Sequence, residues 1–313
     1  MQVLEEVVCN LCGSGAAKTL YRVAEFGIVR CRQCGLVYVS PRLPAERLKR
    51  EVYDEGYFDA QRGYGIADHF GAGSAEAERR AGELLAEVER IMKPPGDILD
   101  VGSAGGFFPA AAARGGWNAR AVEIAPTAAE FARKNFGLEV FEGEITDAPY
   151  DDETFDAVTM FDVIEHLTNP YAALRKAFRL LRRGGRIFIV TPSFDSLPRR
   201  ILGADWGLLA PEHHLYYFTP ATLRKLVEIA GFKVEKITLP SFGLADLFLT
   251  ASTLRRAGFR VDDDARRRMR RSLGAIRDRL HGFVNDVDVR VLKPLLPRAP
   301  GNAIHLVALK QPV

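Results

Sequence analysis

Cysteine is scarce in this chain of 313 residues, and charge of one sign is not in excess. Only four cysteines occur, and 43 basic against 40 acidic side chains leave a formal net charge of +3. A balance this close does not by itself indicate a nucleic-acid partner. No apolar run approaches the roughly 18 residues that a membrane-spanning helix needs. The start, MQVLEEVVCNLCG, lacks the basic and apolar regions of a secretory signal. These absences favour a cytoplasmic protein.

The cysteines form two Cys-x2-Cys pairs near the N-terminus: Cys9, Cys12, Cys31 and Cys34. Two residues between thiolates let both sulfurs of a tight turn bind one ion, and two such turns complete a tetrahedron. Gly13 and Gly35 follow the pairs, where glycine can take the positive φ that such a turn often needs. Disulfides are the alternative, and the lack of an export signal argues against them. Because protein ligands fill all four positions, we predict a structural zinc.

Patterns along the chain divide it into five parts. The cysteine-bearing segment is too short to bury a sufficient core alone, so metal binding is expected to stabilise it. A stretch with helical spacing then precedes a long region in which strand and helix patterns alternate. The predicted parts are a zinc ribbon at 1–45, a helical linker or cap at 46–93, a core at 94–240, a helical insertion at 241–300 and the last strand of the core sheet at 301–313.

From residue 97 onward, short apolar runs alternate with helical segments. The runs are DILDVG, ARAVEI, EVFEG, FDAVTMF, RIFIVTPS, KVEKITL and NAIHLVALKQ. Strands separated by helices of about ten or more residues indicate βαβ units and a mainly parallel sheet. The predicted fold class is therefore α/β, a Rossmann-like doubly wound sheet with the small ribbon at its N-terminus and a helical insertion before its last strand.

Glycines and acids mark the ends of these predicted strands. Asp100 ends the first strand, and Gly102 and Gly106 lie in the turn that follows, where backbone amides attract carboxylates or phosphates. Glu123 ends the second strand, where an acid can accept hydrogen bonds from ribose hydroxyls, and Glu144 follows the third. A glycine-rich turn alone is a weak signal. Acids at the carboxyl ends of consecutive strands strengthen it and favour a nucleotide-like ligand.

These residues belong to longer blocks: ILDVGSAGGFF, AVEIAPTAAEFAR, GEITDAPYDDETFDAVTMFDVIEHLTNPYAALR, LLRRGGRIFIVTPS and HLYYFTPATLRKLVEIAGF. From Asp97 to about Val190 the chain resembles the class I S-adenosylmethionine-dependent methyltransferases, which implies S-adenosyl-L-methionine as cofactor. Ala104 stands where the family's middle glycine is usual. Carried over position by position, the resemblance assigns cofactor binding to Asp100, Gly102, Ser103, Gly106, Phe107, Glu123, Ile124, Glu144, Ile145, Phe161 and Asp162.

The cysteine pairs followed by CGLVYVSPR and VYDEGYF extend the resemblance to deoxysugar C-methyltransferases and related carbohydrate methyltransferases. The C-methyltransferases carry catalytic polar groups in a YHEHxxYFS-like segment, which here reads APEHHLYYFT. His214 and the later tyrosine and phenylalanine match that pattern. His213 stands where glutamate is usual, Glu212 where histidine is usual, and Pro211 replaces tyrosine.

The hypothesis for the chemistry is methyl transfer to a small-molecule substrate, sugar-like or otherwise hydroxylated, such as a nucleotide sugar or glycan. A hydroxyl or carbon acid must lose a proton, and histidine suits that task near neutral pH. We predict His214 as general base, supported by Glu212 or His213, with His166 as a second candidate. A catalytic metal at 212–214 is not expected, because three consecutive residues cannot easily face one ion.

Two other classes of function stay open. The ribbon and an arginine-rich helix could dock RNA for methylation of a base. The arginines alternate with acids, however, and no aromatic–basic platform is evident, which disfavours nucleic acid. The helix expected over 265–291 has apolar residues at steps of three and four. It could contact a membrane peripherally, although packing on its own domain or a dimer partner is favoured.

Overall fold

A computed structural model describes residues 4–51, 74–241 and 300–311 of the chain. The chain forms two compact units. The first comprises Met1–Thr191, Pro211–Thr238 and His305–Val313, and the second comprises Pro192–Ala210 and Leu239–Ile304. The helix predicted over 265–291 lies outside the described residues. The division of the chain into five parts stays a prediction.

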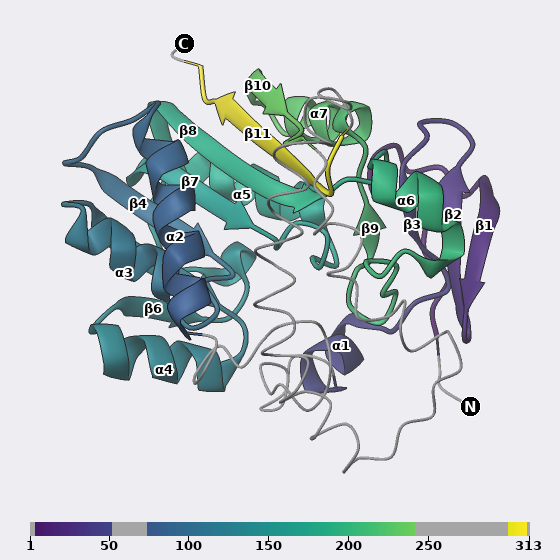
Figure 1. Ribbon diagram of the computed structural model, residues 1–313, viewed down its shortest axis with the longest axis horizontal. Helices are drawn as coiled ribbons and strands as arrows, with labels where there is room; N and C mark the ends of the chain where they lie inside the picture. The colour runs from purple at the N-terminus through teal and green to yellow at the C-terminus, as the bar shows by residue number, and fades with distance from the viewer. Residues whose placement is uncertain (1–3, 52–73, 242–299, 312–313) are drawn as a thin grey trace, which may run out of the picture. The chain divides into compact units, whose positions relative to one another are not determined.

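The first unit contains a seven-stranded sheet in the order β10-β11-β8-β7-β4-β5-β6 (Figure 1). The pairings among β4, β5, β6, β7 and β8 are all parallel. Strand β10 pairs with β11 in the antiparallel sense. The strand order reverses between β4 and β7, and ligands of such sheets bind outside the carboxyl ends at that point. The predicted α/β doubly wound fold is confirmed. Its strands are β4 (Asp97–Val101), β5 (Asn118–Glu123), β6 (Glu139–Glu142), β7 (Phe155–Phe161), β8 (Leu181–Pro192), β10 (Lys233–Thr238) and β11 (Ala303–Leu309).

The middle portions of the sheet's central strands are largely apolar because both of their faces are buried there. Leu99 in β4, Val158 in β7 and Ile187 in β8 are completely buried. Alanines where β5 faces α4 let helix and sheet approach closely. Ala121 and Ala129 belong to the buried apolar cluster at this contact. The core therefore fixes the carboxyl ends of β4, β5 and β7 rigidly.

Helices alternate with the strands as the sequence predicts. Side chains cap two of these helices: Asn169 accepts from the Ala172 amide at the start of α5, and Thr219 with Thr222 forms a capping box before α7. Within the described ranges no helix is both long and apolar enough to span a bilayer. The helices are α1 (Ala45–Glu51), α2 (Ser74–Glu89), α3 (Phe107–Arg114), α4 (Pro126–Phe136), α5 (Pro170–Leu180), α6 (Leu197–Leu202) and α7 (Pro220–Ile229), with short 3-10 turns η1 (Ile145–Asp147) and η2 (Gly203–Asp205).

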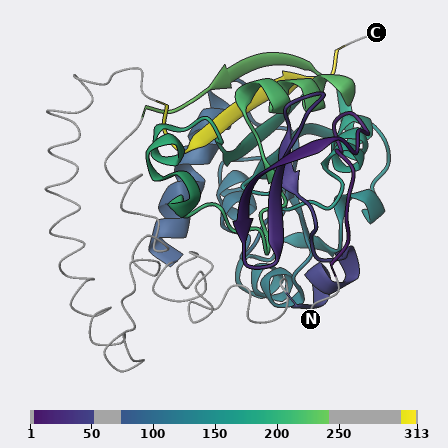
Figure 2. The same cartoon turned by 90° about the vertical axis from the view of Figure 1, so that its right-hand side faces the viewer.

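A second sheet of four strands also belongs to the first unit, in the order β1-β2-β3-β9. All three pairings are antiparallel. Its N-terminal strands are the purple arrows facing the viewer in Figure 2. The strands are β1 (Ala17–Val23), β2 (Phe26–Cys31), β3 (Val37–Val39) and β9 (Tyr216–Tyr217). Strand β9 was not expected, because two residues are too few to show an alternating pattern.

Two element boundaries differ from the sequence-based expectation. Strand β8 starts at Leu181, before the predicted run RIFIVTPS, and includes the RRGGR segment. Gly184 takes a φ of +81°, and its amide donates to the Lys310 carbonyl, so the segment stays paired. Helix α2 ends at Glu89, before the end of the helical linker predicted over 46–93, and Ile91 beyond it is exposed.

Candidate active site and metal centre

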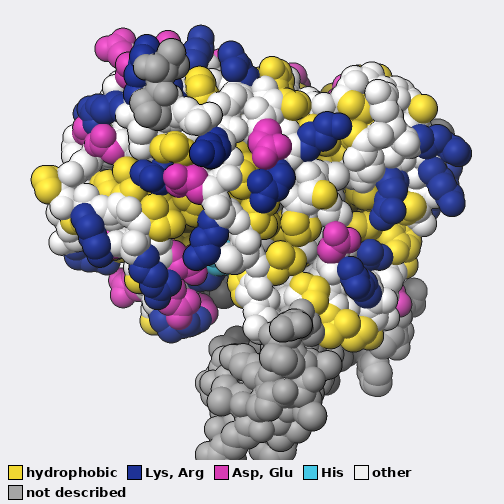
Figure 3. Space-filling view, turned by 90° about the horizontal axis from the view of Figure 1, so that it is seen from above, with side chains coloured by type: hydrophobic (Ala, Val, Ile, Leu, Met, Phe, Trp, Pro, Cys, Tyr) yellow, Lys and Arg dark blue, Asp and Glu magenta, His cyan; other side chains and the backbone are white. Residues whose placement is uncertain are grey.

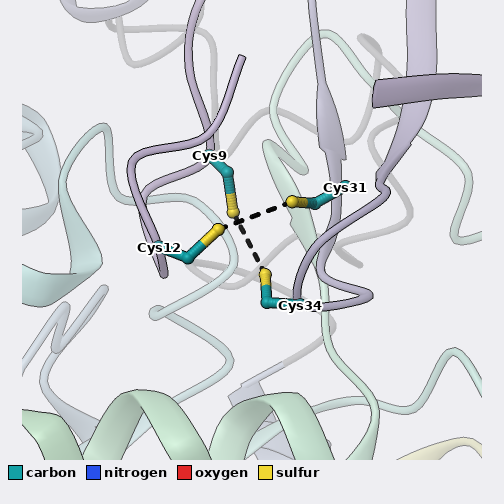
Figure 4. A group of neighbouring side chains, drawn as sticks. All are labelled: Cys9, Cys12, Cys31 and Cys34. Carbon is teal, nitrogen blue, oxygen red and sulfur yellow. Dashed lines mark hydrogen bonds between the residues drawn. The ribbon is translucent and has the colours of Figure 1, made fainter. Parts of the chain in front are cut away.

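The four cysteines converge at one point (Figure 4). The Sγ atoms of Cys9 and Cys34 are 3.4 Å apart, those of Cys12 and Cys31 are 3.5 Å apart, and all four lie within 4.8 Å of one another. Four sulfurs at about 2.3 Å from a tetrahedral zinc would be separated by about 3.8 Å. The thiol cluster therefore fits zinc in size, shape and donor type.

The turns that carry the cysteines have the expected backbone. Gly13 and Gly35 take φ values of +74° and +80°, and their amides donate to the carbonyls of Cys9 and Cys31. Burial acts to raise the pKa of the Cys31 thiol, but hydrogen bonds from the backbone amides of Cys34 and Gln33 and from the thiols of Cys12 and Cys34 together lower it to about 7. Burial raises the pKa of Cys9 and Cys34, so metal binding has to displace the protons of these two thiols.

The turn from β4 into α3 requires glycine at two positions for different reasons. Gly102 has a φ of +70°, and a Cβ there would lie 2.4 Å from Val163 at the end of β7. Gly106 has a φ of +80°, and a Cβ there would lie 2.6 Å from the Ala132 side chain in α4. Gly102 therefore lets two strand ends approach, whereas Gly106 lets two helices pack. Ala104, at the family's usual glycine position, also has a positive φ, of 48°.

Glu123 at the end of β5 joins two loops. Its Oε2 accepts a 2.7 Å hydrogen bond from the Ala104 amide, and its Oε1 accepts a 2.8 Å hydrogen bond from the Ala125 amide. Burial raises the pKa of this carboxyl, and the amides oppose the shift. Because a carboxylate offers about four lone-pair positions, Glu123 can hold both amides and still accept hydrogen bonds from a ligand.

Two buried polar groups of the same turn suit a polar ligand. The Oγ atom of Ser103 makes no hydrogen bond to any described residue. Asp100 is buried and accepts a 2.6 Å hydrogen bond from Thr159. Burial raises its pKa to about 7, with a further contribution from the charge of Glu123. These groups fit a cofactor that brings hydrogen-bonding and cationic groups to the end of β4.

The remaining predicted cofactor residues line the same edge of the sheet. Ile145 is buried in η1, while Glu144 before it forms a 2.8 Å ion pair with Lys49 of α1. Phe161 at the end of β7 makes an edge-to-face contact with Phe108. Three further positions complete the set at the ends of β5 and β7 and at the start of α3: Ile124, Asp162 and Phe107.

The predicted histidines come together from two distant segments. The rings of His166 and His214 have centroids 4.7 Å apart, and those of His213 and His214 are 4.6 Å apart. His166 Nδ1 lies 3.0 Å from the carbonyl oxygen of His213. A carbonyl only accepts, so Nδ1 carries the proton and Nε2 carries the lone pair. Burial, reinforced by neighbouring imidazoles, holds the pKa of His166 and His213 well below the usual value, which keeps both rings neutral.

Glu165 is the residue that sequence reasoning missed. It lies beside His166 after β7, it is 1% exposed, and its Oε2 accepts a 2.8 Å hydrogen bond from Thr191. Its Oε1 lies 3.9 Å from His166 Nε2 and has no hydrogen-bond partner among described residues. Glu212 is exposed, in contrast to its buried neighbours His213 and His214. The signal in the sequence was the adjacency of an acid to His166.

Fold and site together define an α/β enzyme that holds a nucleoside-containing cofactor at the switch point of its sheet. A family model described as "Methyltransferase domain" matches residues 75–237, just over half of the chain. The chain belongs to this family and is an S-adenosylmethionine-dependent methyltransferase. S-adenosylmethionine is the cofactor expected of this fold, and the polar groups of Ser103, Asp100 and Glu123 are the ones that would hold it.

The curated relatives match about half of this chain. The Ubiquinone biosynthesis O-methyltransferase of Xanthomonas axonopodis pv. citri is 30% identical over 169 residues, which cover 49% of this chain and 70% of the relative. The enzyme of the same name from Xylella fastidiosa is 28% identical and spans 48% of this chain and 66% of its own length. A SAM-dependent methyltransferase from Archaeoglobus fulgidus superimposes with a TM-score of 0.51 at 18% identity, over 75% of this chain and 94% of that one. That likeness concerns the fold alone.

Proposed function

We propose that this methyltransferase transfers the methyl group to a small hydroxylated molecule, sugar-like or phenolic, and that His214 accepts the proton that the acceptor loses. The observation that carries the proposal is the cluster of three imidazoles beside the end of β7. In-line displacement at a sulfonium mainly requires alignment of acceptor and donor. His166 of this cluster lies four residues past Asp162, after the strand end that the cofactor is expected to flank.

The environment of the cluster supports base catalysis. His166 and His213 are neutral because burial lowers their pKa values. They therefore add no positive charge that would oppose proton uptake by His214. The aromatic ring of Tyr217 lies edge-on to His214, with centroids 6.5 Å apart. Apolar neighbours of this kind limit water around the reacting groups.

The names of the relatives favour oxygen as the methyl acceptor. Both reported relatives are named as ubiquinone biosynthesis O-methyltransferases. A small phenol therefore stands beside a nucleotide sugar as the acceptor to test. RNA has less support, because the basic side chains on the face shown in Figure 3 are interspersed with acidic and hydrophobic ones. Membrane contact through residues 265–291 stays a prediction.

A mass-spectrometric screen tests the acceptor class directly. Purified protein and S-adenosylmethionine would be incubated with nucleotide sugars, small phenols and RNA. We expect the mass gain of one methyl group in a sugar or phenol. A gain found in RNA alone would replace this proposal with the RNA-base alternative.

A second candidate function for the histidine cluster is to bind a divalent cation. One ligand atom each from Glu165, His166 and His214 lies within 4.8 Å of the others, although the three residues come from two segments. A bound cation could lower the pKa of an acceptor hydroxyl. Equilibrium dialysis with Mn²⁺ or Zn²⁺ compares wild type with Glu165→Gln. Equal cation binding by wild type and Glu165→Gln would remove this candidate.

A further inference from the structure

The sheet of the zinc ribbon extends into the segment that carries the catalytic histidines. Strand β3 begins at Val37, three residues after Cys34, and its outer edge pairs with β9. Val37 is opposite Tyr217, and the Val39 amide donates a 2.9 Å hydrogen bond to the Leu215 carbonyl. Leu215 is the residue after His214. The ribbon and the histidine segment are thus parts of one sheet.

The same short segment is held on its other side by the methyltransferase core. The amides of Leu215 and Tyr216 both donate to the carbonyl of Glu165, at 2.8 and 3.1 Å. The ring of His166 contacts the carbonyl of His213 at 3.0 Å. A strand of two residues cannot hold a conformation by itself. Its position is therefore set by the two structures between which it lies.

Arg42 connects the ribbon to β9 and to the loop before α5 through its side chain. The residue follows β3, is 8% exposed, and lies close to Glu5, with 3.3 Å between its Nε and the carboxylate. Its Nη1 donates to the Thr168 carbonyl at 3.3 Å and to the Tyr216 hydroxyl at 3.4 Å. The Tyr216 hydroxyl donates in turn to the Thr168 carbonyl. One buried guanidinium thus connects the ribbon, β9 and the loop before α5.

A second link starts inside the first cysteine pair. Asn10 lies between Cys9 and Cys12, and its side chain contacts Asn169, the N-cap of α5, at 3.1 Å. Its Oδ1 also accepts a 3.1 Å hydrogen bond from the Tyr171 amide. The turn that would wrap the zinc therefore touches the start of α5 directly.

From these contacts we propose that the zinc ribbon positions the catalytic histidines, with Arg42 as the main positioning residue. The proposal rests on the proposed function of His214. Loss of zinc unfolds the ribbon, because so short a segment depends on its metal. The edge of β9 then loses its partner, and His213 and His214 lose their fixed place. The predicted cofactor residues lie at the ends of β4, β5 and β7, in the turn into α3 and around η1, and are not part of this sheet.

The central test compares Arg42→Ala with Arg22→Ala in the full-length chain. Arg22 is exposed in β1, at the opposite edge of the ribbon sheet, and serves as the matched control. We expect Arg42→Ala to lower kcat by about 10- to 100-fold, because small misplacements of reacting groups cost that much. The affinity for S-adenosylmethionine, measured by calorimetry, should stay within about twofold of wild type. Arg22→Ala should match wild type in both.

Hydrogen exchange supplies a readout that does not depend on activity. In Arg42→Ala, and in wild type stripped of zinc by a chelator, the peptide 211–218 should exchange at least about tenfold faster, while β4 and β7 stay protected. Tyr216→Phe removes one hydroxyl and should change the exchange in the same direction by less. It replaces Arg42→Ala if that variant fails to fold.

Two results would overturn the positioning role. One is unchanged exchange of 211–218 after zinc removal. The other is a loss of cofactor affinity in Arg42→Ala that parallels the loss of kcat, since Arg42 would then stabilise the whole unit. If His214→Ala keeps full turnover while exchange still responds to zinc, the proposed base is wrong and the coupling between ribbon and segment stands.

Discussion

Glu123 is a single side chain that organises two loops and is also expected to receive the ribose. Its two oxygens accept the amides of Ala104 and Ala125. Glu123→Gln replaces one of these acceptors with a donor that faces an amide, and it removes the charge. Hydrogen bonds to a charged group contribute about 1.5–3 kcal/mol each, so calorimetry should show cofactor affinity at least about tenfold weaker. Glu142→Gln, at the exposed end of β6, is the control. Equal affinities would place the ribose elsewhere.

His214 carries the proposed chemical step. A positioned general base contributes about 10²–10⁴-fold to turnover, so His214→Ala should reduce kcat by that factor in steady-state assays with cofactor affinity nearly unchanged. His213→Ala should reduce kcat by a smaller factor. The His213 ring only stacks on His166, whereas the hydrogen bond to His166 comes from the backbone carbonyl of His213, which alanine keeps. Turnover of His214→Ala within about threefold of wild type would identify His166 as the better candidate.

The element α3 depends on the glycine at its start. At Gly106 a side chain would meet Ala132 and Leu138 at 2.6 and 2.9 Å, and the backbone φ is +80°. At Gly137, where α4 ends, φ is +65° but nothing lies within 4 Å of the added carbon. We expect Gly106→Ala to lower the free energy of unfolding by about 1–3 kcal/mol more than Gly137→Ala does. Chemical denaturation measures both, and equal losses would show that only backbone strain matters.

At the scale of structural elements, the stability of the ribbon should depend on its metal. Cys31→Ser removes one of four thiolates, so elemental analysis should find less zinc than in wild type. Proteolysis should cut within 1–45 more readily, because the segment loses its main source of stability. Affinity for S-adenosylmethionine should stay largely unchanged. Wild-type protein that folds well without zinc would contradict this prediction.

At the scale of the whole molecule, Asp100 should make stability depend on pH. Burial raises its pKa from 3.8 in the unfolded chain to about 7 in the folded one. Between these values the folded state binds more protons than the unfolded state, so the free energy of unfolding should fall as pH rises from about 4 to about 7. Denaturation of the cofactor-free protein measures this slope. Asp100→Asn should flatten it, and an unchanged slope would assign the dependence to another group.

Local patterns in the sequence were enough to predict the fold class and most of the elements around the site. The spacing of Cys9, Cys12, Cys31 and Cys34 defines two turns, and turns are determined by neighbouring residues. Apolar runs of the right length predicted β4 to β8 because buried parallel strands are apolar on both faces. The positions of Asp100 and Glu123 at strand ends followed from the predicted ends of these apolar runs.

Only the tertiary structure decided which distant segments meet. Strand β9 has two residues and pairs with β3 across most of the chain, so no local pattern could reveal it. Glu165 joins the histidines because β7 ends beside the segment that precedes β9, and Lys49 reaches Glu144 because α1 lies near η1. Such contacts depend on packing of elements that are far apart in sequence. The sequence by itself therefore determined the cofactor-binding class of this protein, whereas long-range packing assembled the side chains proposed for catalysis.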